Sequence, residues 1–138
     1  MKPVRILETS LYASDLAAAE RFYTRVIGLD VHSRAEGRHV FFRVGDGMLL
    51  VFDPNRTRSD PTTAGGEIVP LHGAKGAGHV AFAVAENEIA AWREHLEREG
   101  VQVESEVTWP AGGRSLYVRD PAGNSIELAP PGIWGLRS

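Results

Sequence analysis

The chain has 138 residues, and a hydrophobic content of 43% is enough for one compact domain that buries roughly 68% of its unfolded surface. Its 15 Lys and Arg residues and 18 Asp and Glu residues give a formal charge of −3 without any basic run, which argues against a nucleic-acid partner. The lack of cysteine excludes disulfides, thiolate metal sites and a cysteine nucleophile, and no stretch has the ~18 apolar residues of a membrane span. Since residues 1–5 also lack the pattern of a signal peptide, we expect a cytoplasmic protein with no membrane partner.

A first module of one strand, one helix and three strands is predicted over about residues 4–53. Residues 6–13 alternate like a strand, and a helical spacing of apolar residues begins after Asp15 and ends at Gly28, a typical C-terminal cap. Three further strands are expected at residues 29–33, 39–44 and 48–53, the last two joined by a tight turn. Residues 54–76, with three prolines and four glycines, are expected to form a surface linker.

A second module with the same order of elements is predicted over about residues 77–130, followed by a tail at 131–138. A strand at 79–84 precedes a helix whose apolar residues Ile89, Trp92 and Leu96 lead to Gly100. Strands are expected at residues 101–107, 115–119 and 125–129, with a turn at 120–124. The pattern favours an α+β protein in which helices cover one face of each sheet, and we expect residues 1–138 to form a single domain.

The two modules match each other in sequence pattern, as a duplicated unit would. Residues 6–13 correspond to residues 77–84, which sets Glu8 against His79. The hairpin at 39–52 overlays the hairpin at 115–128 without a gap, which sets Val51 against Glu127. A duplicated unit builds one site from two halves, so polar residues at matched strand positions are the candidates for chemistry.

Strand alternation places Glu8, His79 and Glu127 on the faces of their strands that point away from the helices. The small residues Ala81 and Ala83 share the face of His79, which leaves room beside it. Two carboxylates in an enclosed space are costly if unpaired, so a cation is expected there. Arginine is one candidate. The other is a single divalent ion, manganese, iron(II), nickel or zinc, for which two carboxylates and an imidazole are suitable ligands.

Other polar residues carry weaker signals. His39 overlays Ser115 and Arg43 overlays Arg119, so His39 and Arg43 are candidates either for the opposite wall of a site or for a solvated strand face. His72 is interpreted as a loop histidine, the alternative being that it closes over a substrate.

Short motifs in a fixed order cover nearly the whole chain. They are Ala-Ser-Asp-Leu at residues 13–16, Arg-Phe-Tyr at 21–23, Ile-Gly-Leu at 27–29, Gly-His-Val-Ala-Phe at 78–82, and the segment at 117–128 that ends in Asn-Ser-Ile-Glu-Leu. In this order they resemble the vicinal oxygen chelate superfamily. That superfamily includes glyoxalase I, fosfomycin-resistance proteins, extradiol dioxygenases and bleomycin-binding proteins.

The resemblance implies two tandem βαβββ modules that form a cupped mixed sheet around a central cavity. It implies a metal held at four places, which here are Glu8, Val51, His79 and Glu127. Because valine cannot ligate, three protein ligands would remain, with open positions for water or substrate. The resemblance also implies that three residues face the substrate, namely Ser10, Ser115 and Tyr117.

The leading hypothesis is a metal-dependent enzyme that chelates a small substrate through adjacent oxygens, with lyase or isomerase chemistry favoured over dioxygenase chemistry. Glu8 stands where the fosfomycin-resistance and dioxygenase members usually have histidine, and this harder ligand set fits the glyoxalase type better. Glu8 or Glu127 is the expected general base. A small-molecule substrate and a homodimer are the expected partners, the homodimer because exposed sheet edges must be covered.

Two alternatives stay open. One is a metal-free protein of the bleomycin-resistance type that sequesters an aromatic or antibiotic molecule, with stacking surface from Tyr12, Phe41, Trp109 and Tyr117. The other is a purely structural protein in which ion pairs replace the metal. A chelator would abolish the activity of the enzyme and leave the ligand affinity of the sequestering protein unchanged.

Overall fold

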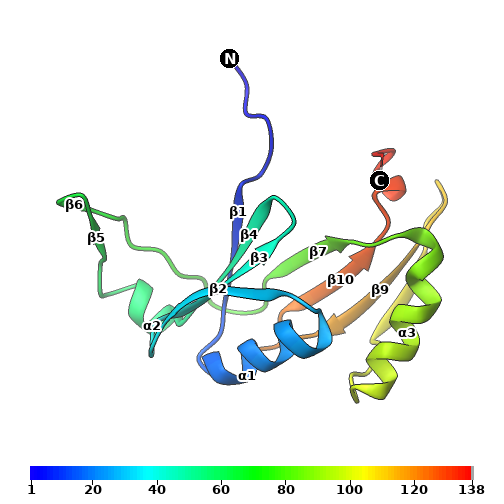
Figure 1. Cartoon of the computed structure of the whole chain (residues 1–138), viewed down its shortest axis with the longest axis horizontal. Helices are drawn as coiled ribbons and strands as arrows, with labels where there is room; N and C mark the ends of the chain where they lie inside the picture. Colours follow the sequence, from blue (N-terminus) through cyan, green and yellow to red (C-terminus); the bar gives the residue numbers. More distant parts are fainter. Residues whose placement is uncertain (138) are drawn as a thin grey trace. The chain divides into compact units, whose positions relative to one another are not determined.

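The computed structural model describes residues 1–137, and the chain divides into two compact units, Met1–Gly78 and His79–Ser138. Each unit is built on one four-stranded mixed sheet with a helix of its own (Figure 1). Among the described residues, no helix is long and apolar enough to cross a membrane. The predicted α+β class is confirmed, whereas a single domain over the whole chain stays a prediction.

The first sheet contains β1 (Glu8–Tyr12), β2 (Asp30–Ala35), β3 (His39–Val44) and β4 (Gly47–Phe52). The predicted helix begins as α1 (Leu16–Arg21), where the Asp15 carboxylate accepts a hydrogen bond from the Ala18 N–H at 2.9 Å. It continues as a π-helical turn, η1 (Phe22–Val26). Gly28 ends the helix with a φ of +84°, a conformation that favours glycine, which confirms the predicted cap.

The segment predicted to be a linker contains regular structure. Helix α2 (Pro54–Thr57) begins after Asp53, whose carboxylate accepts a hydrogen bond from the Asn55 N–H at 2.9 Å. Proline at the first helical position is favourable because the missing N–H would have no partner there. A short hairpin follows, formed by β5 (Thr63–Ala64) and β6 (Glu67–Ile68).

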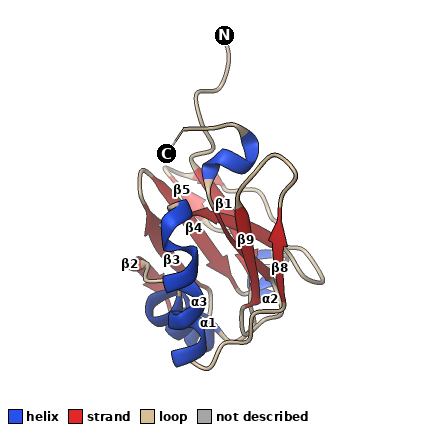
Figure 2. Ribbon diagram, turned by 90° about the vertical axis from the view of Figure 1, so that its right-hand side faces the viewer, coloured by secondary structure: helices blue, strands red, loops and turns tan. Residues whose placement is uncertain are grey.

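The second sheet contains β7 (His79–Ala83), β8 (Ser105–Thr108), β9 (Arg114–Arg119) and β10 (Ser125–Ala129). A 3-10 turn, η2 (Glu86–Glu88), leads into α3 (Ile89–Arg98), and a second one, η3 (Pro131–Trp134), follows the sheet. The strand expected at 101–107 begins only at Ser105 and lies beside β9 as an edge strand (Figure 2).

Both sheets have the same topology, which confirms the duplication. The strand order is β1-β4-β3-β2 in the first unit and β7-β10-β9-β8 in the second. In each, the first strand of the module runs parallel to the last, and the remaining neighbours are antiparallel. Glu8 pairs with Met48 and His79 pairs with Ser125 at the same end of these parallel ladders, so the matching of Glu8 with His79 agrees with the register.

The apolar core of each unit lies between its sheet and its helix. Helix α1 packs against β3 and β4, and α3 packs against β9. The strand residues on this side are buried, among them Leu11, Val40, Phe42, Leu49 and Val51 in the first sheet and Phe82, Leu116, Val118, Ile126 and Leu128 in the second. Because side chains alternate along a strand, the opposite side of each sheet, called its open face below, carries the residues between them.

The gapless overlay of the two hairpins is wrong by one residue in β4. Glu127 pairs with Tyr117, whereas Phe41, which matches Tyr117 in β3, pairs with Leu50. The second hairpin therefore has one residue more between equivalent partners, and the counterpart of Glu127 is Leu50 rather than Val51. Val51 has no exposed surface and belongs to the helix side. Since leucine cannot ligate either, the fourth place still offers no metal ligand.

The turn between β9 and β10 is held by one buried carboxylate. The Asp120 Oδ1 atom accepts hydrogen bonds at 2.9 Å from the backbone N–H groups of Ala122 and Asn124, and its Oδ2 atom accepts one from Asn124 Nδ2 at 2.9 Å. Both Asp120 and Asn124 are buried. These bonds fix the longer connection that sets the register of Glu127.

Asp120→Ala is expected to lower the free energy of unfolding by about 2–4 kcal/mol, because it leaves the backbone N–H and the side-chain amide of the buried Asn124 without acceptors. Urea unfolding monitored by circular dichroism measures this difference. Asp46→Ala, in the exposed turn between β3 and β4, is the matched control and should change stability by less than about 0.5 kcal/mol. Equal midpoints for the two variants would show that the turn does not depend on Asp120.

Candidate functional site

His79 and Glu127 lie next to each other on the open face of the second sheet. They stand on the parallel neighbours β7 and β10, with Ala81 opposite Glu127 in the ladder. The His79 Nε2 and Glu127 Oε2 atoms are 3.4 Å apart. The imidazole is half exposed, whereas the carboxylate is buried. The small side chain of Ala81 therefore leaves room for the carboxylate to lie beside the ring.

The surroundings of the His79 ring decide which of its nitrogens carries a proton. The Nδ1 atom lies 3.0 Å from the backbone carbonyl oxygen of Ser125. A carbonyl oxygen can only accept a hydrogen bond, so Nδ1 is the donor and the neutral ring has its lone pair on Nε2. That lone pair stands on the side of Glu127 Oε2, which is also an acceptor. Two facing acceptors need a cation, which is either a proton on Nε2 or a metal ion.

The second carboxylate oxygen of Glu127 also indicates a site for a cation. Within the described residues, Oε1 is buried and has no hydrogen-bond partner. A proton on His79 Nε2 could form a hydrogen bond with Oε2 only and would leave Oε1 without a partner. A buried carboxylate oxygen without a partner is rare in folded proteins and suggests a site for an ion.

Tyr117 completes this group from the neighbouring strand β9. It pairs directly with Glu127 in the ladder, and its ring stacks at 6.2 Å from the His79 ring, with an angle of 21° between the planes. Burial, the hydrogen bond to Glu127 and the charge of that carboxylate together raise the pKa of the Tyr117 phenol to about 12, burial contributing most. At neutral pH the phenol is therefore a proton donor beside the carboxylate.

The residues of this group fit a divalent ion. Two ligands that each lie about 2.1 Å from one ion, at angles between a right angle and a tetrahedral one, are roughly 3.0–3.4 Å apart. The separation of 3.4 Å between Nε2 and Oε2 lies at the end of that range. The hydrogen bond from Nδ1 to a carbonyl is also the support that a ligating histidine usually has.

A third ligand is not supplied within either unit, since the described residues of neither gather three His, Asp or Glu side chains around a point. Glu8 stands on the open face of the first sheet and is exposed. Ser10 lies two residues further along the same face, opposite Leu50. The structure thus brings together His79, Glu127 and Tyr117, while the contribution of Glu8 and Ser10 stays a prediction.

Ser115 lies on the open face of the second sheet but has no exposed surface. Its hydroxyl oxygen accepts a hydrogen bond from the Trp109 indole Nε1 at 2.8 Å. The same loop is closed by backbone bonds between Trp109 and Gly113. Ser115 therefore anchors the loop at 109–113 to β9, and its predicted contact with substrate remains untested.

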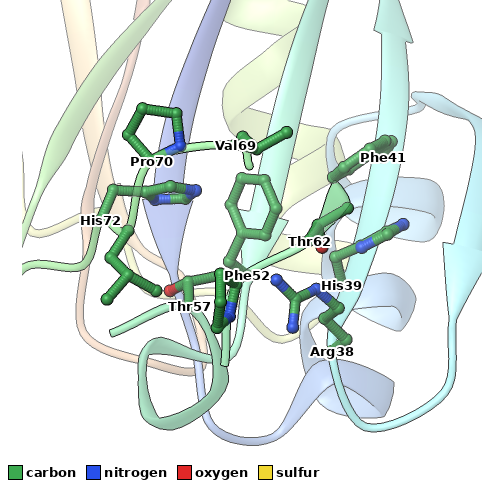
Figure 3. A pocket seen from close by; sticks show the side chains of 11 residues that line it. Arg38, His39, Phe41, Phe52, Thr57, Thr62, Val69, Pro70 and His72 are labelled. Carbon is green, nitrogen blue, oxygen red and sulfur yellow. The ribbon is translucent and has the colours of Figure 1, made fainter. Parts of the chain in front are cut away.

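Analysis of the sequence missed a cavity in the first unit. It has a volume of about 200 Å³ and lies between the open face of the sheet and the segment at 57–72 (Figure 3). His39 and His72, which carried weak signals, both line it, and His72 Nδ1 is 2.8 Å from the Tyr12 hydroxyl. Arg38 also lines it, although nothing in the sequence marked this residue.

Comparison with known proteins gives the family of the chain. Residues 5–128 match the family model of the Glyoxalase/Bleomycin resistance protein/Dioxygenase superfamily. A lactoylglutathione lyase from Agrobacterium tumefaciens has a similar structure at 42% identity, with a TM-score of 0.91 over 99% of this chain and 100% of that one. No curated protein matches.

Two further solved structures are more distant. A glyoxalase/bleomycin resistance protein/dioxygenase from Nocardioides is 25% identical, with a TM-score of 0.71 over 94% of this chain and 85% of that one. A virulence protein from Salmonella typhimurium is 22% identical, with a TM-score of 0.71 over 94% of this chain and 98% of that one, and shows the shared fold. The match to the family model spans most of the chain and includes both modules, and the chain belongs to the Glyoxalase/Bleomycin resistance protein/Dioxygenase superfamily.

Proposed function

We propose that the protein is a divalent-metal-dependent enzyme that carries out lyase or isomerase chemistry on a small substrate with adjacent oxygen atoms. The observation that carries this proposal is the buried, unpartnered Oε1 atom of Glu127 beside an imidazole whose Nε2 faces the same carboxylate. The 42% identity to a lactoylglutathione lyase supports the choice of lyase chemistry over dioxygenase chemistry.

His79 and Glu127 would hold the ion, and Glu8 is proposed as the third ligand because it occupies the place of His79 in the first module. Two carboxylates and one imidazole suit manganese, iron(II), nickel or zinc. Leucine at position 50, the counterpart of Glu127, leaves coordination positions free for substrate or water. When bound, the ion supplies Lewis-acid polarisation of the substrate oxygens.

The side chains around the pair have distinct proposed roles. Glu127 is proposed as the general base, because its carboxylate, once displaced from the ion by substrate, stands within reach of a substrate proton. Glu8 is the other candidate for this role. Tyr117 keeps its proton at neutral pH, and the hydrogen bond that it gives to Glu127 would pass to a substrate oxygen on which negative charge develops. A homodimer and a cytoplasmic location stay predictions from the sequence.

Isothermal titration of chelator-treated protein tests the ligand set. We expect about one divalent ion to bind per chain, and His79→Ala or Glu127→Gln to weaken binding by at least roughly a hundredfold, because each removes a ligand. Turnover of lactoylglutathione, the compound for which the similar lyase is named, should be lost on chelation and return with the ion.

Glu97→Gln, at an exposed position on α3, is the matched control and should bind the ion like the unchanged protein. Retention of full ion affinity by Glu127→Gln would refute the pair as a metal site. If Glu8→Gln alone retains affinity, Glu8 is removed from the ligand set while the pair stands.

Titration of Tyr117 tests the same site without an activity assay. In ion-free protein the absorbance change at high pH that Tyr117→Phe removes should be centred near pH 12, and Glu127→Gln should move it downward because the carboxylate charge is lost. A bound divalent ion should move it in the same direction. Since the folded pKa lies above the ordinary value, the protonated phenol stabilises the fold below about pH 10, and this contribution disappears as the pH rises through 12.

Tyr12 is the internal control for this titration. Burial raises its pKa too, and the absorbance change that Tyr12→Phe removes distinguishes its titration from that of Tyr117. A Tyr117 titration that is the same with and without the Glu127 carboxylate would show that the two groups do not interact.

A further inference from the structure

The cavity of the first unit has an aromatic floor. His39 and Phe41 come from β3 and Phe52 from β4, and His39 pairs with Phe52 across the ladder. His39 stacks on Phe41 with 3.8 Å between ring centroids and 10° between the planes. Phe52 stands edge-on to Phe41, at 5.2 Å and 74°. The floor therefore offers both ring faces and ring edges, which is the arrangement that aromatic ligands prefer.

The opposite wall comes from the segment that was expected to be a plain linker. Val69, Pro70 and His72 cover the floor from this side (Figure 3). The His72 ring lies edge-on to Phe52 at 4.6 Å. Backbone bonds from the His72 N–H to the Thr57 carbonyl and from the Val69 N–H to the Thr62 carbonyl, at 3.1 and 2.8 Å, tie the wall together. The cavity is therefore built by hydrogen-bonded structure on both sides.

The size of the cavity fits a ligand with a single aromatic ring. Its volume is about 200 Å³. An apolar cavity of about 150 Å³ in another protein stays dry and takes up benzene, so this one has room for a single aromatic ring with a small substituent.

The polar groups at the cavity favour an anionic substituent. The Arg38 side chain is only 18% exposed, and among the described residues its one ion pair, to Asp60, is long at 3.5 Å. Asp60 also pairs with Arg56 at 3.0 Å, so its charge is shared between two arginines. A guanidinium group has five N–H donors in a fork that matches a carboxylate. Arg38 thus brings a largely buried positive charge to the cavity with little compensation.

His39 adds a second unsatisfied polar atom. Its Nδ1 is buried and has no hydrogen-bond partner within the described chain. Burial, and then the charge of Arg38, lower the pKa of His39, so the ring is neutral at physiological pH and adds no positive charge of its own. A ligand oxygen or a water molecule is what such an atom needs.

We propose that this cavity is a binding site for a monocyclic aromatic acid, with the ring packed against Phe41, Phe52 and His72 and the carboxylate on Arg38. The site needs no metal ion and uses none of the residues assigned to the proposed enzyme. Of the residues that the sequence suggested as stacking surface, namely Tyr12, Phe41, Trp109 and Tyr117, Phe41 lines this cavity.

Calorimetric titration of the chelator-treated protein with benzoate tests the proposal. Benzoate should bind saturably, benzyl alcohol roughly tenfold more weakly, and acetate not measurably, because the site needs both the ring and the charge. Arg38→Gln should weaken benzoate binding by roughly tenfold and leave benzyl alcohol unchanged. Arg34→Gln is the matched control, since Arg34 is an exposed arginine of the same unit that pairs with Glu20 and does not line the cavity, and it should bind benzoate like the unchanged protein.

Amide chemical shifts of the unchanged protein locate the ligand even if a variant fails to fold. On addition of benzoate, the affected amides should be those of residues 38–41, 52 and 57–72. Absence of saturable binding at millimolar benzoate, equal affinity for benzyl alcohol, or shifts centred on the second unit would each overturn the proposal. Because the protein is ion-free, these results do not depend on the proposed metal site, and loss of ion binding in Glu127→Gln leaves this test unaffected.

Discussion

The candidate site of the second unit is organised around one buried carboxylate. Glu127 lies in the middle of a sheet, its Oε1 atom has no partner in the described chain, and the histidine beside it turns a second acceptor toward it. Burial of a charge without compensation is costly, so this arrangement is stable only with a cation at hand. Tyr117 donates to the carboxylate but cannot neutralise it. The fold thus keeps an unsatisfied acceptor group in place, which suits an ion-binding site better than a core.

The two units share one framework and use it differently. The same strand order and the same ladder positions place Glu8 where the second unit has His79, and Leu50 where it has Glu127. In the first unit the open face therefore carries an apolar surface next to Arg38, which has excess positive charge. In the second unit the open face carries hydrogen-bond acceptors instead. One half of the duplicated chain is suited to an anion with a ring, the other to a cation.

Strand alternation made much of the fold and part of the site predictable. The period-two pattern around His79 and Glu127 separated small and polar residues from bulky ones, and both side chains lie on the expected face. Val51 was misplaced because the overlay counted residues, whereas the register is set by the turn that Asp120 stabilises. Arg38 could not be recognised at all, since it stands just before β3 and gains its role only from the wall at 57–72.

Because neighbouring side chains of a strand lie on opposite sides of the sheet, the two units can differ on their open faces and still share one type of core. Along β4, Leu49 and Val51 are buried in the core, while Leu50 between them belongs to the open face. In β10 the corresponding pattern is Ile126, Glu127 and Leu128. A change from leucine to glutamate at the middle position leaves the helix-side packing intact, because neighbouring side chains point to opposite sides of the sheet. The core can therefore stay fixed while the open face changes, and the turn that sets the register decides which side chain occupies the position of Glu127.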